Sequence, residues 1–309
     1  MVPFVSNRRS FLSALIGGAA GFSVSYRAYG QTAPPPITAT KLSKDLVMVS
    51  GDGGNVGVVI GADGLMMIDG GLPDRAGDLI QAIADQVDGH KVDLLFDTHW
   101  HFDHIGCNET LGKRGVKIMA HENVKKRLST KQVMEAMNRT FEPLKPEGLP
   151  TQTFQEGGKM TYAEEKIEYK HVPTAHTDGD TFMFFPGPNV IHTGDLFFNK
   201  TYPVIDYSTG GWIGGMVTAA KTILGVGDKS TRIIPGHGPL ASKDDLKATH
   251  DMLATVHARL EKISKEGKTI EEVLAAAPTK DLDVVWGKGM MSPERFLRMA
   301  YPSIARHQA

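Results

Sequence analysis

Three histidines and one aspartate lie within six consecutive positions of the segment THWHFDH, residues 98–104. The run KVDLLFDT leads directly into this segment and is predicted to be a strand. Because residues two apart in an extended chain point the same way, His99 and His101 can bind one ion together. Asp103 and His104 then turn towards a second position. Imidazole nitrogens with a carboxylate suit Zn²⁺ or another borderline cation, so the loop predicts a metal site.

The pattern His-x-His-x-Asp-His after a strand resembles the signature of the metallo-β-lactamase-fold hydrolases. Further motifs of that family occur here in the same order and spacing: MMIDGG before the loop, then PTAHTDGD, HTGDLFF and PGHGP after it. The resemblance covers essentially all of residues 46–240. It implies an α/β fold, namely an αββα sandwich in which two mixed β-sheets are flanked by helices.

The resemblance also implies two groups of metal ligands that share one aspartate. These are His99, His101 and His176 for the first metal, Asp103, His104 and His237 for the second, and Asp195 as the bridge. Asp69, in MMIDGG, would steady the histidine loop without touching a metal. Two Zn²⁺ ions per chain are expected, with iron or manganese as alternatives.

Two cations bound in this way lower the pKa of bound water from about 16 towards 7 and so supply hydroxide at neutral pH. We expect the hydroxide to attack a carbonyl carbon, and less readily a phosphoryl or sulfuryl centre. Asp103 is the expected catalytic residue, which orients the nucleophile or accepts its proton. The sequence therefore predicts a zinc-dependent hydrolase that cleaves an ester, lactone, thioester or lactam bond in a small-molecule substrate.

Several alternatives stay open within the same fold. The best-known penicillin- and carbapenem-hydrolysing subgroup has a cysteine in place of Asp195 and a lysine in place of Phe198, which argues against that type. A cysteine-free β-lactamase subgroup shares the histidine motif and is not excluded. A diiron oxygen- or nitric-oxide-reducing protein would normally carry glutamate in place of His101. An iron oxygenase, such as the sulfur dioxygenases that keep the histidine loop, or a periplasmic redox or maturation protein remains as a non-hydrolytic alternative.

The first 30 residues are expected to be a cleavable export signal. Arg8 and Arg9 precede the apolar run of residues 11–24, and small residues follow at Ala28 and Gly30, as in a twin-arginine (Tat) leader. The apolar run is 14 residues long, whereas a membrane-spanning helix needs about 20. We therefore expect a periplasmic protein without a stable membrane span after processing. Residues 31–45 are expected to be a proline-rich spacer.

Residues 46–309 are expected to form one metallo-β-lactamase-like domain. Strand-like runs alternate with helical patterns at residues 74–87, 121–137 and 216–224, and at 243–265, where Ser242 and Asp245 form a predicted capping box. Thr269 and Glu272 repeat the capping pattern. The whole chain has a net charge of −1, and because the first 30 residues hold three arginines and no acid, residues 31–309 carry −4. This charge argues against a nucleic-acid binder. The sequence gives no indication of the oligomeric state.

Two smaller features carry weaker expectations. Cys107 is the only cysteine, which excludes an intrachain disulfide, and it is expected to be a small buried apolar residue. The segment of residues 199–216 contains Tyr202, Tyr207 and Trp212 among glycines. Its aromatic side chains either form a mobile wall over the metals or pack into the core.

Overall fold

The computed structural model describes residues 34–51, 53–86 and 90–308. The expected export signal of residues 1–30 lies outside the described residues. Residues from Pro35 onwards form one compact unit. Within the described part of the chain, no helix is long and apolar enough to cross a membrane.

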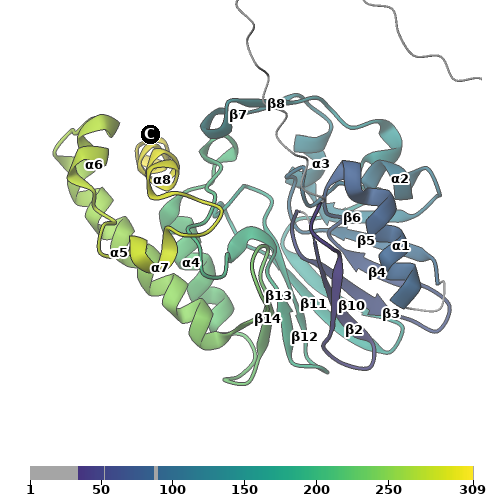
Figure 1. Cartoon of the computed structure of the whole chain (residues 1–309). Helices are drawn as coiled ribbons and strands as arrows, with labels where there is room; N and C mark the ends of the chain where they lie inside the picture. Colours follow the sequence, from purple (N-terminus) through teal and green to yellow (C-terminus); the bar gives the residue numbers. More distant parts are fainter. Residues whose placement is uncertain (1–33, 52, 87–89, 309) are drawn as a thin grey trace, which may run out of the picture. The chain divides into compact units, whose positions relative to one another are not determined.

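Two mixed β-sheets form the centre of this unit (Figure 1). The first has the strand order β1 (Thr38–Lys41), β2 (Leu46–Ser50), β3 (Val56–Ile60), β4 (Leu65–Ile68), β5 (Val92–Asp97), β6 (Lys117–His121) and β9 (Gln152–Phe154). The second has the order β10 (Gly157–Tyr162), β11 (Glu165–His171), β12 (Thr181–Phe185), β13 (Val190–His192), β14 (Arg232–Ile234) and β15 (Ala241–Ser242). The neighbours β4, β5, β6 and β9 are parallel, as is the pair β13 and β14, and the other pairs are antiparallel.

The strand sequences alternate between two buried faces. Leu46 and Met48 of β2 pack in the apolar cluster that also contains Met183 and Phe185 of the second sheet. Val47 and Val49 of the same strand belong to a separate cluster with the apolar face of helix α1 (Ala76–Gln86). Because successive side chains of a strand point to opposite faces, β2 contributes side chains both to the core between the sheets and to the core between the first sheet and α1.

A second helical layer covers the outer face of the second sheet. Strand residues such as Phe182, Ile191 and Ile233 share an apolar cluster with helices α4 (Ile213–Leu224), α5 (Lys243–Lys265) and α8 (Pro293–Gln308). Helices α6 (Ile270–Ala276) and α7 (Asp283–Trp286) complete this side, and α2 (Asn108–Gly112) and α3 (Glu122–Leu128) lie on the side of α1 (Figure 1). The predicted αββα sandwich is confirmed. The predicted capping boxes before α5 and α6 are present as well.

The structure corrects the expectation of one helix over residues 121–137. Helix α3 ends at Leu128, and a hairpin of β7 (Gln132–Met134) and β8 (Arg139–Phe141) follows. The hydroxyls of Ser129 and Thr130 both donate to the carbonyl of Lys126. Hydroxyl side chains that bond to the backbone compete with helix continuation, which is the physical reason for the break.

The folded unit also begins before the expected boundary at residue 46. Strand β1 lies within the segment expected to be a spacer, and it pairs with β2 along its whole length, from Thr38 opposite Ser50 to Lys41 opposite Val47. Its side chains are exposed, so it has none of the apolar alternation that predicts a strand. Backbone pairing alone places it at the edge of the sheet.

Candidate metal centre

The predicted ligands come from several strands that end at the same edge of the sandwich. Asp69 follows β4, and the histidine loop follows the parallel neighbour β5. Asp195 follows β13, and His237 follows the parallel neighbour β14. The carboxyl ends of parallel neighbours meet at one sheet edge, which brings these segments together. His176 lies in the connection between β11 and β12.

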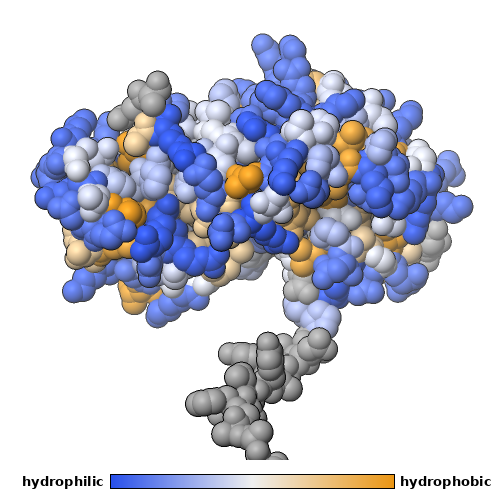
Figure 2. Space-filling model, turned by 90° about the horizontal axis from the view of Figure 1, so that it is seen from above, coloured by the Kyte–Doolittle hydropathy of each residue, from blue (hydrophilic) through white to orange (hydrophobic). Residues whose placement is uncertain are grey.

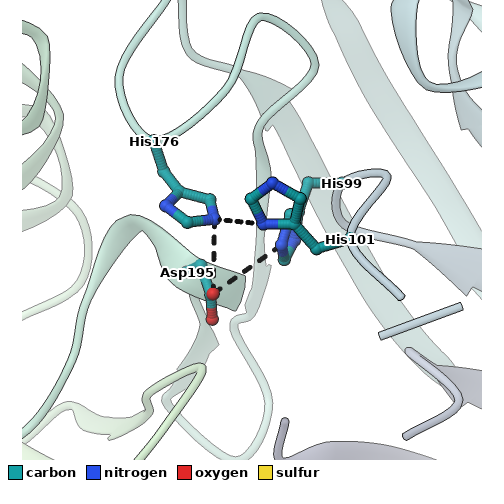
Figure 3. Close-up of side chains that lie close together, drawn as sticks. All are labelled: His99, His101, His176 and Asp195. Atoms are coloured by element: carbon teal, nitrogen blue, oxygen red, sulfur yellow. Dashed lines mark hydrogen bonds and ion pairs between the residues drawn. The ribbon is translucent and has the colours of Figure 1, made fainter. Parts of the chain in front are cut away.

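Four of the predicted ligands form the first group, and all four are buried. Figure 3 shows His99, His101, His176 and Asp195 with their polar atoms directed towards one another. His176 Nε2 lies 2.8 Å from His101 Nδ1 and 3.3 Å from Asp195 Oδ2. His99 Nε2 lies 3.7 Å from the same aspartate oxygen.

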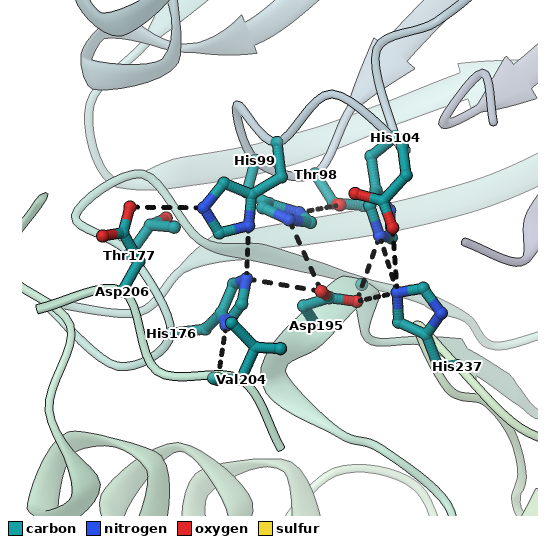
Figure 4. Close-up of polar contacts among 12 residues, drawn as sticks. Thr98, His99, His104, His176, Thr177, Asp195, Val204, Asp206 and His237 are labelled. Carbon is teal, nitrogen blue, oxygen red and sulfur yellow. Dashed lines mark hydrogen bonds and ion pairs between the residues drawn. The ribbon is translucent and has the colours of Figure 1, made fainter. Parts of the chain in front are cut away.

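Asp103, His104 and His237 form the second group, and Asp195 connects it to the first. His237 Nε2 lies 3.4 Å from Asp103 Oδ2 and 3.4 Å from His104 Nε2. The other oxygen of Asp195, Oδ1, lies 3.1 Å from His104 Nε2 and 3.4 Å from His237 Nε2. Asp195 therefore lies between the two groups with one oxygen directed at each, as Figure 4 shows.

The residues present fit a pair of divalent cations. Nitrogen and oxygen ligands about 2.0–2.2 Å from a tetrahedral Zn²⁺ lie roughly 3.4 Å from one another. The distances from Asp195 to its histidine neighbours are 3.1–3.7 Å. His99 Nε2 and Asp195 Oδ1 are also buried without a hydrogen-bond partner within the described part of the chain. Buried polar atoms of this kind need a partner, and a cation between the groups supplies one.

The charges of most of these groups suit cations as well. His104 and His237 must each release a proton to bind a metal, because Asp195 outweighs the effect of burial and raises the pKa of His237 to about 9 and that of His104 well above its usual value. Burial lowers the pKa of His176 to about 4 and places that of His99 well below its usual value, so both rings are neutral and offer a lone pair. Burial alone would raise the pKa of Asp103, but the hydrogen bond from His237 and the nearby His104 lower it to about 2. For Asp195 the neighbouring histidines likewise outweigh burial and hold its pKa well below the usual range. Neutral imidazoles and ionised carboxylates are the ligand forms that metals bind.

Asp69 contacts the histidine loop through both oxygens of its carboxylate. Its Oδ1 accepts the backbone N–H of Thr98 at 2.8 Å, and its Oδ2 accepts the Thr98 hydroxyl at 2.9 Å. Oδ2 also lies 2.8 Å from His104 Nδ1, which leaves His104 Nε2 facing Asp195. The Asp69 backbone has a φ of 66°, a left-handed conformation that aspartate and asparagine tolerate better than most residues.

Two orienting contacts were not predicted from the sequence. Asp206 Oδ2 lies 3.2 Å from His101 Nε2, whereas His176 lies at the other ring nitrogen, Nδ1. The carbonyl of Val204 lies 2.8 Å from His176 Nδ1. Both contacts fix which ring nitrogen faces the other ligands. The loop of residues 199–216 provides them, and no motif in that loop marks Asp206 as functional.

Asn55 and two glycines shape the second group. The Asn55 side-chain amide donates to the carbonyls of Pro235 and Gly238, on both sides of His237. A Cβ on Gly236 would lie 2.0 Å from Asp195 Oδ1, and a Cβ on Gly54 would lie 2.1 Å from His104 Cε1. Only glycine permits the backbone to approach the ligands this closely at these two positions.

Of the aromatic side chains of residues 199–216, only Tyr202 packs in the core, whereas Tyr207 and Trp212 are partly exposed and contact Arg306 and His307 of α8. The Tyr202 ring is buried and stacks on Phe296 of α8 at 4.5 Å, and its hydroxyl donates to Asp283. Trp212 stacks on His307 at 3.6 Å. Cys107 is fully buried, as predicted.

Comparison with known sequences identifies one family. A family model described as the metallo-beta-lactamase superfamily matches residues 49–246. A hydroxyacylglutathione hydrolase of Trichodesmium erythraeum (strain IMS101) is 28% identical over 115 residues, which are 37% of this chain and 37% of that protein. A metallo-beta-lactamase type 2 of Bacillus cereus is 22% identical over 193 residues, which are 62% of this chain and 69% of that protein.

Solved structures show the same fold. A metallo-beta-lactamase from Pontibacter korlensis superposes with a TM-score of 0.57 at 19% identity, over 71% of this chain and 99% of that one. A stereoselective inverting sec-alkylsulfatase from Pseudomonas sp. superposes with a TM-score of 0.68 at 17% identity, over 86% of this chain and 50% of that one. At these identities the similarity concerns the fold alone.

Proposed function

The chain belongs to the metallo-beta-lactamase superfamily, and from this premise we propose that it is a two-metal hydrolase that cleaves an ester, thioester, lactone or lactam bond of a small molecule. The observation that supports this most directly is the position of Asp195. Its two oxygens face two separate groups of nitrogen and oxygen donors. One carboxylate shared between two ligand groups is typical of a dinuclear centre.

In this proposal His99, His101 and His176 hold one cation, Asp103, His104 and His237 hold the other, and Asp195 contacts both. Two divalent cations bound there lower the pKa of a water ligand and polarise the substrate carbonyl. Asp103 is ionised and only partly exposed, so its carboxylate would orient the nucleophile by accepting a hydrogen bond from it. Asp69, Asp206 and the Val204 carbonyl hold the histidine rings in place.

The names of the two curated relatives support acyl compounds as substrates, because one is a hydroxyacylglutathione hydrolase and the other a metallo-beta-lactamase. Phe198 argues against the penicillin- and carbapenem-hydrolysing subgroup, which is expected to carry a lysine at this position. Its ring is buried and stacks on His237 at 5.1 Å, so it provides no cation for a drug carboxylate. A β-lactamase of the cysteine-free type is the second candidate.

The first experiment is reconstitution of the purified protein with zinc, followed by a panel of chromogenic esters, thioesters, lactones, phosphate and sulfate esters and a cephalosporin. We expect two zinc ions per chain and turnover of at least one acyl substrate. Chelation should abolish this turnover and added zinc should restore it. Asp228→Asn is the control for the aspartate variants discussed below and should keep full turnover. Asp228 accepts three hydrogen bonds, none of them from a histidine.

Protein purified from its native host decides between hydrolysis and the iron-dependent alternative. Two zinc ions per chain support the hydrolase. A single iron accompanied by oxygen uptake during turnover would replace the proposal with an oxygenase.

We further propose export to the periplasm through the twin-arginine leader of residues 1–30. The sequence of the leader is the support for this, through Arg8 and Arg9. Cell fractionation should recover the wild-type protein from the periplasm, whereas replacement of both arginines by lysine should retain it in the cytoplasm. Periplasmic recovery of the double variant would contradict this route.

A further inference from the structure

A cavity of about 480 Å³ lies between the histidine loop and the β7–β8 hairpin. Trp100, Phe102 and Ile105 contribute the loop side of its lining, and Phe141 and Leu144 contribute part of the opposite side. Apolar and aromatic side chains with a few charged groups are the usual lining of a small-molecule site. The hairpin is on the face of the molecule shown in Figure 2, where hydrophobic residues form small separate patches among hydrophilic ones.

Arg139 of β8 lies at this cavity without a carboxylate partner. Its guanidinium carbon is 4.1 Å from the centre of the Phe102 ring and 4.9 Å from that of Phe141. The two rings stack on each other at 5.5 Å. The Arg139 side chain is exposed. Among the described residues, no acidic side chain forms an ion pair with it. Aromatic faces thus hold a planar cation in one place while its N–H groups remain available.

The other charged groups at the cavity mostly have partners. Arg127 binds Asp178 through two hydrogen bonds, of 2.7 and 3.2 Å. Glu142 pairs with Lys131 at 3.2 Å. Asp74 also lines the cavity, and its negative charge opposes an anion. Arg139 is therefore the cation at this cavity that is available to a ligand.

We propose that this cavity binds the non-reacting part of the substrate, and that this part is an apolar or aromatic group carrying a carboxylate that pairs with Arg139. The inference rests on the proposed function for its connection to hydrolysis. Phe102 lies between His101 and Asp103 in the sequence, and the Trp100 ring contacts the His101 ring edge-on at 4.7 Å. A ligand held against Phe102 and Trp100 therefore lies beside the segment that carries four of the proposed metal ligands.

Binding is tested first without turnover, on the folded protein kept metal-free with a chelator. The probes are 4-phenylbutyrate and its neutral analogue 4-phenylbutanol, measured by calorimetric titration. Because an exposed charge pair contributes up to about 1 kcal/mol, wild type should prefer the carboxylate about fivefold. Arg139→Met should remove this preference and keep the binding of the alcohol, since methionine can still pack on the rings.

Lys126→Met is the matched control, because it removes an exposed positive charge of α3 next to the cavity residue Arg127 and leaves the pair of Lys131 and Glu142 intact. It should retain the preference for the carboxylate. The proposal is overturned if Arg139→Met keeps the preference, if Lys126→Met loses it equally, or if neither probe binds. A preference that exists only in the zinc-loaded protein would assign the carboxylate to the metals and would also overturn the proposal.

Turnover of the zinc-loaded enzyme tests the connection to the proposed function. The substrates are 4-nitrophenyl hydrogen glutarate and 4-nitrophenyl valerate, which differ in a terminal carboxylate. Arg139→Met should raise KM for the glutarate ester about fivefold and leave kcat for that ester unchanged. Both kinetic constants for the valerate ester should stay as in wild type. Equal effects on both esters would refute the role of Arg139 and leave hydrolysis established. No turnover of any substrate, with the binding preference intact, would refute the hydrolase and support the binding site.

Discussion

Replacement of Asp69 by asparagine should disable the second metal group while leaving the fold in place. Asp69 is fully buried, and its carboxylate contacts Thr98 through both oxygens and His104 through Oδ2. Asparagine has the same shape and accepts the left-handed φ of 66° found here. The substitution therefore changes one acceptor oxygen into an N–H donor and removes a negative charge beside His104, while the shape of the side chain is almost unchanged.

The magnitude follows from the hydrogen-bond roles at Asp69. The carboxylate Oδ2 accepts from both the Thr98 hydroxyl and His104 Nδ1, whereas the amide NH₂ of an asparagine in this place would donate. The Thr98 hydroxyl can rotate, but His104 must move its proton to Nε2. That atom lies 3.1 Å from Asp195 Oδ1 and would lose the lone pair a metal needs. Loss of such an orienting partner weakens metal binding by about 10- to 100-fold, or about 1.4–2.7 kcal/mol.

The assay is a zinc titration of the metal-free protein against a chromophoric chelator, with folding checked by circular dichroism. We expect Asp69→Asn to bind its first zinc as wild type does and its second at least about tenfold more weakly. Asp228→Asn should titrate like wild type. Two wild-type affinities in a folded Asp69→Asn variant would refute the view that this carboxylate sets the His104 tautomer.

Three further substitutions follow from the same kind of contact. Asp103→Ala should abolish turnover and leave the circular dichroism spectrum unchanged; full activity would rule out its assigned role. Asp206→Asn should weaken the first zinc by about 10- to 100-fold through His101, and an unchanged zinc titration would contradict this. Lys243→Met removes a buried ammonium that donates to three backbone carbonyls at the end of α4 and just after it. Urea unfolding should therefore show a free energy of unfolding about 1–3 kcal/mol lower than that of wild type. The exposed Lys247→Met is its control, and equal stability of both variants would contradict the assigned role of Lys243.

Residues with a local pattern were predictable from the sequence. His99 and His101 alternate on an extended chain, and their neighbours Asp103 and His104 follow in the same loop, so the metal site was visible in one short segment. The motifs around His176, Asp195 and His237 were recognised by resemblance. Strand-forming runs and capping boxes also act locally, which is why β5 and the starts of α5 and α6 were predicted.

Features determined by tertiary contacts were not predictable in this way. Asp206 orients His101 across 105 positions of sequence, and nothing in its own neighbourhood distinguishes it from a turn residue. The β7–β8 hairpin follows a helical pattern that the hydroxyls of Ser129 and Thr130 interrupt. Arg139 becomes a candidate ligand-binding residue only through its position over Phe102 and Phe141. Long-range contacts give Asp206 and Arg139 their positions, whereas the helix break at Ser129 and Thr130 is local and was hidden by the helical pattern around it.

The helical layer over the second sheet has a consequence for biosynthesis. Residues of α8 such as Phe296, Leu297 and Ile304 share one apolar cluster with Phe182 and Ile191 of β12 and β13. While the chain emerges from the ribosome, that sheet face stays uncovered until the last of these helices has been made. The apolar side chains of that face are therefore fully covered only after translation has passed about a hundred residues beyond Asp195, and a chaperone has a long interval in which to bind them.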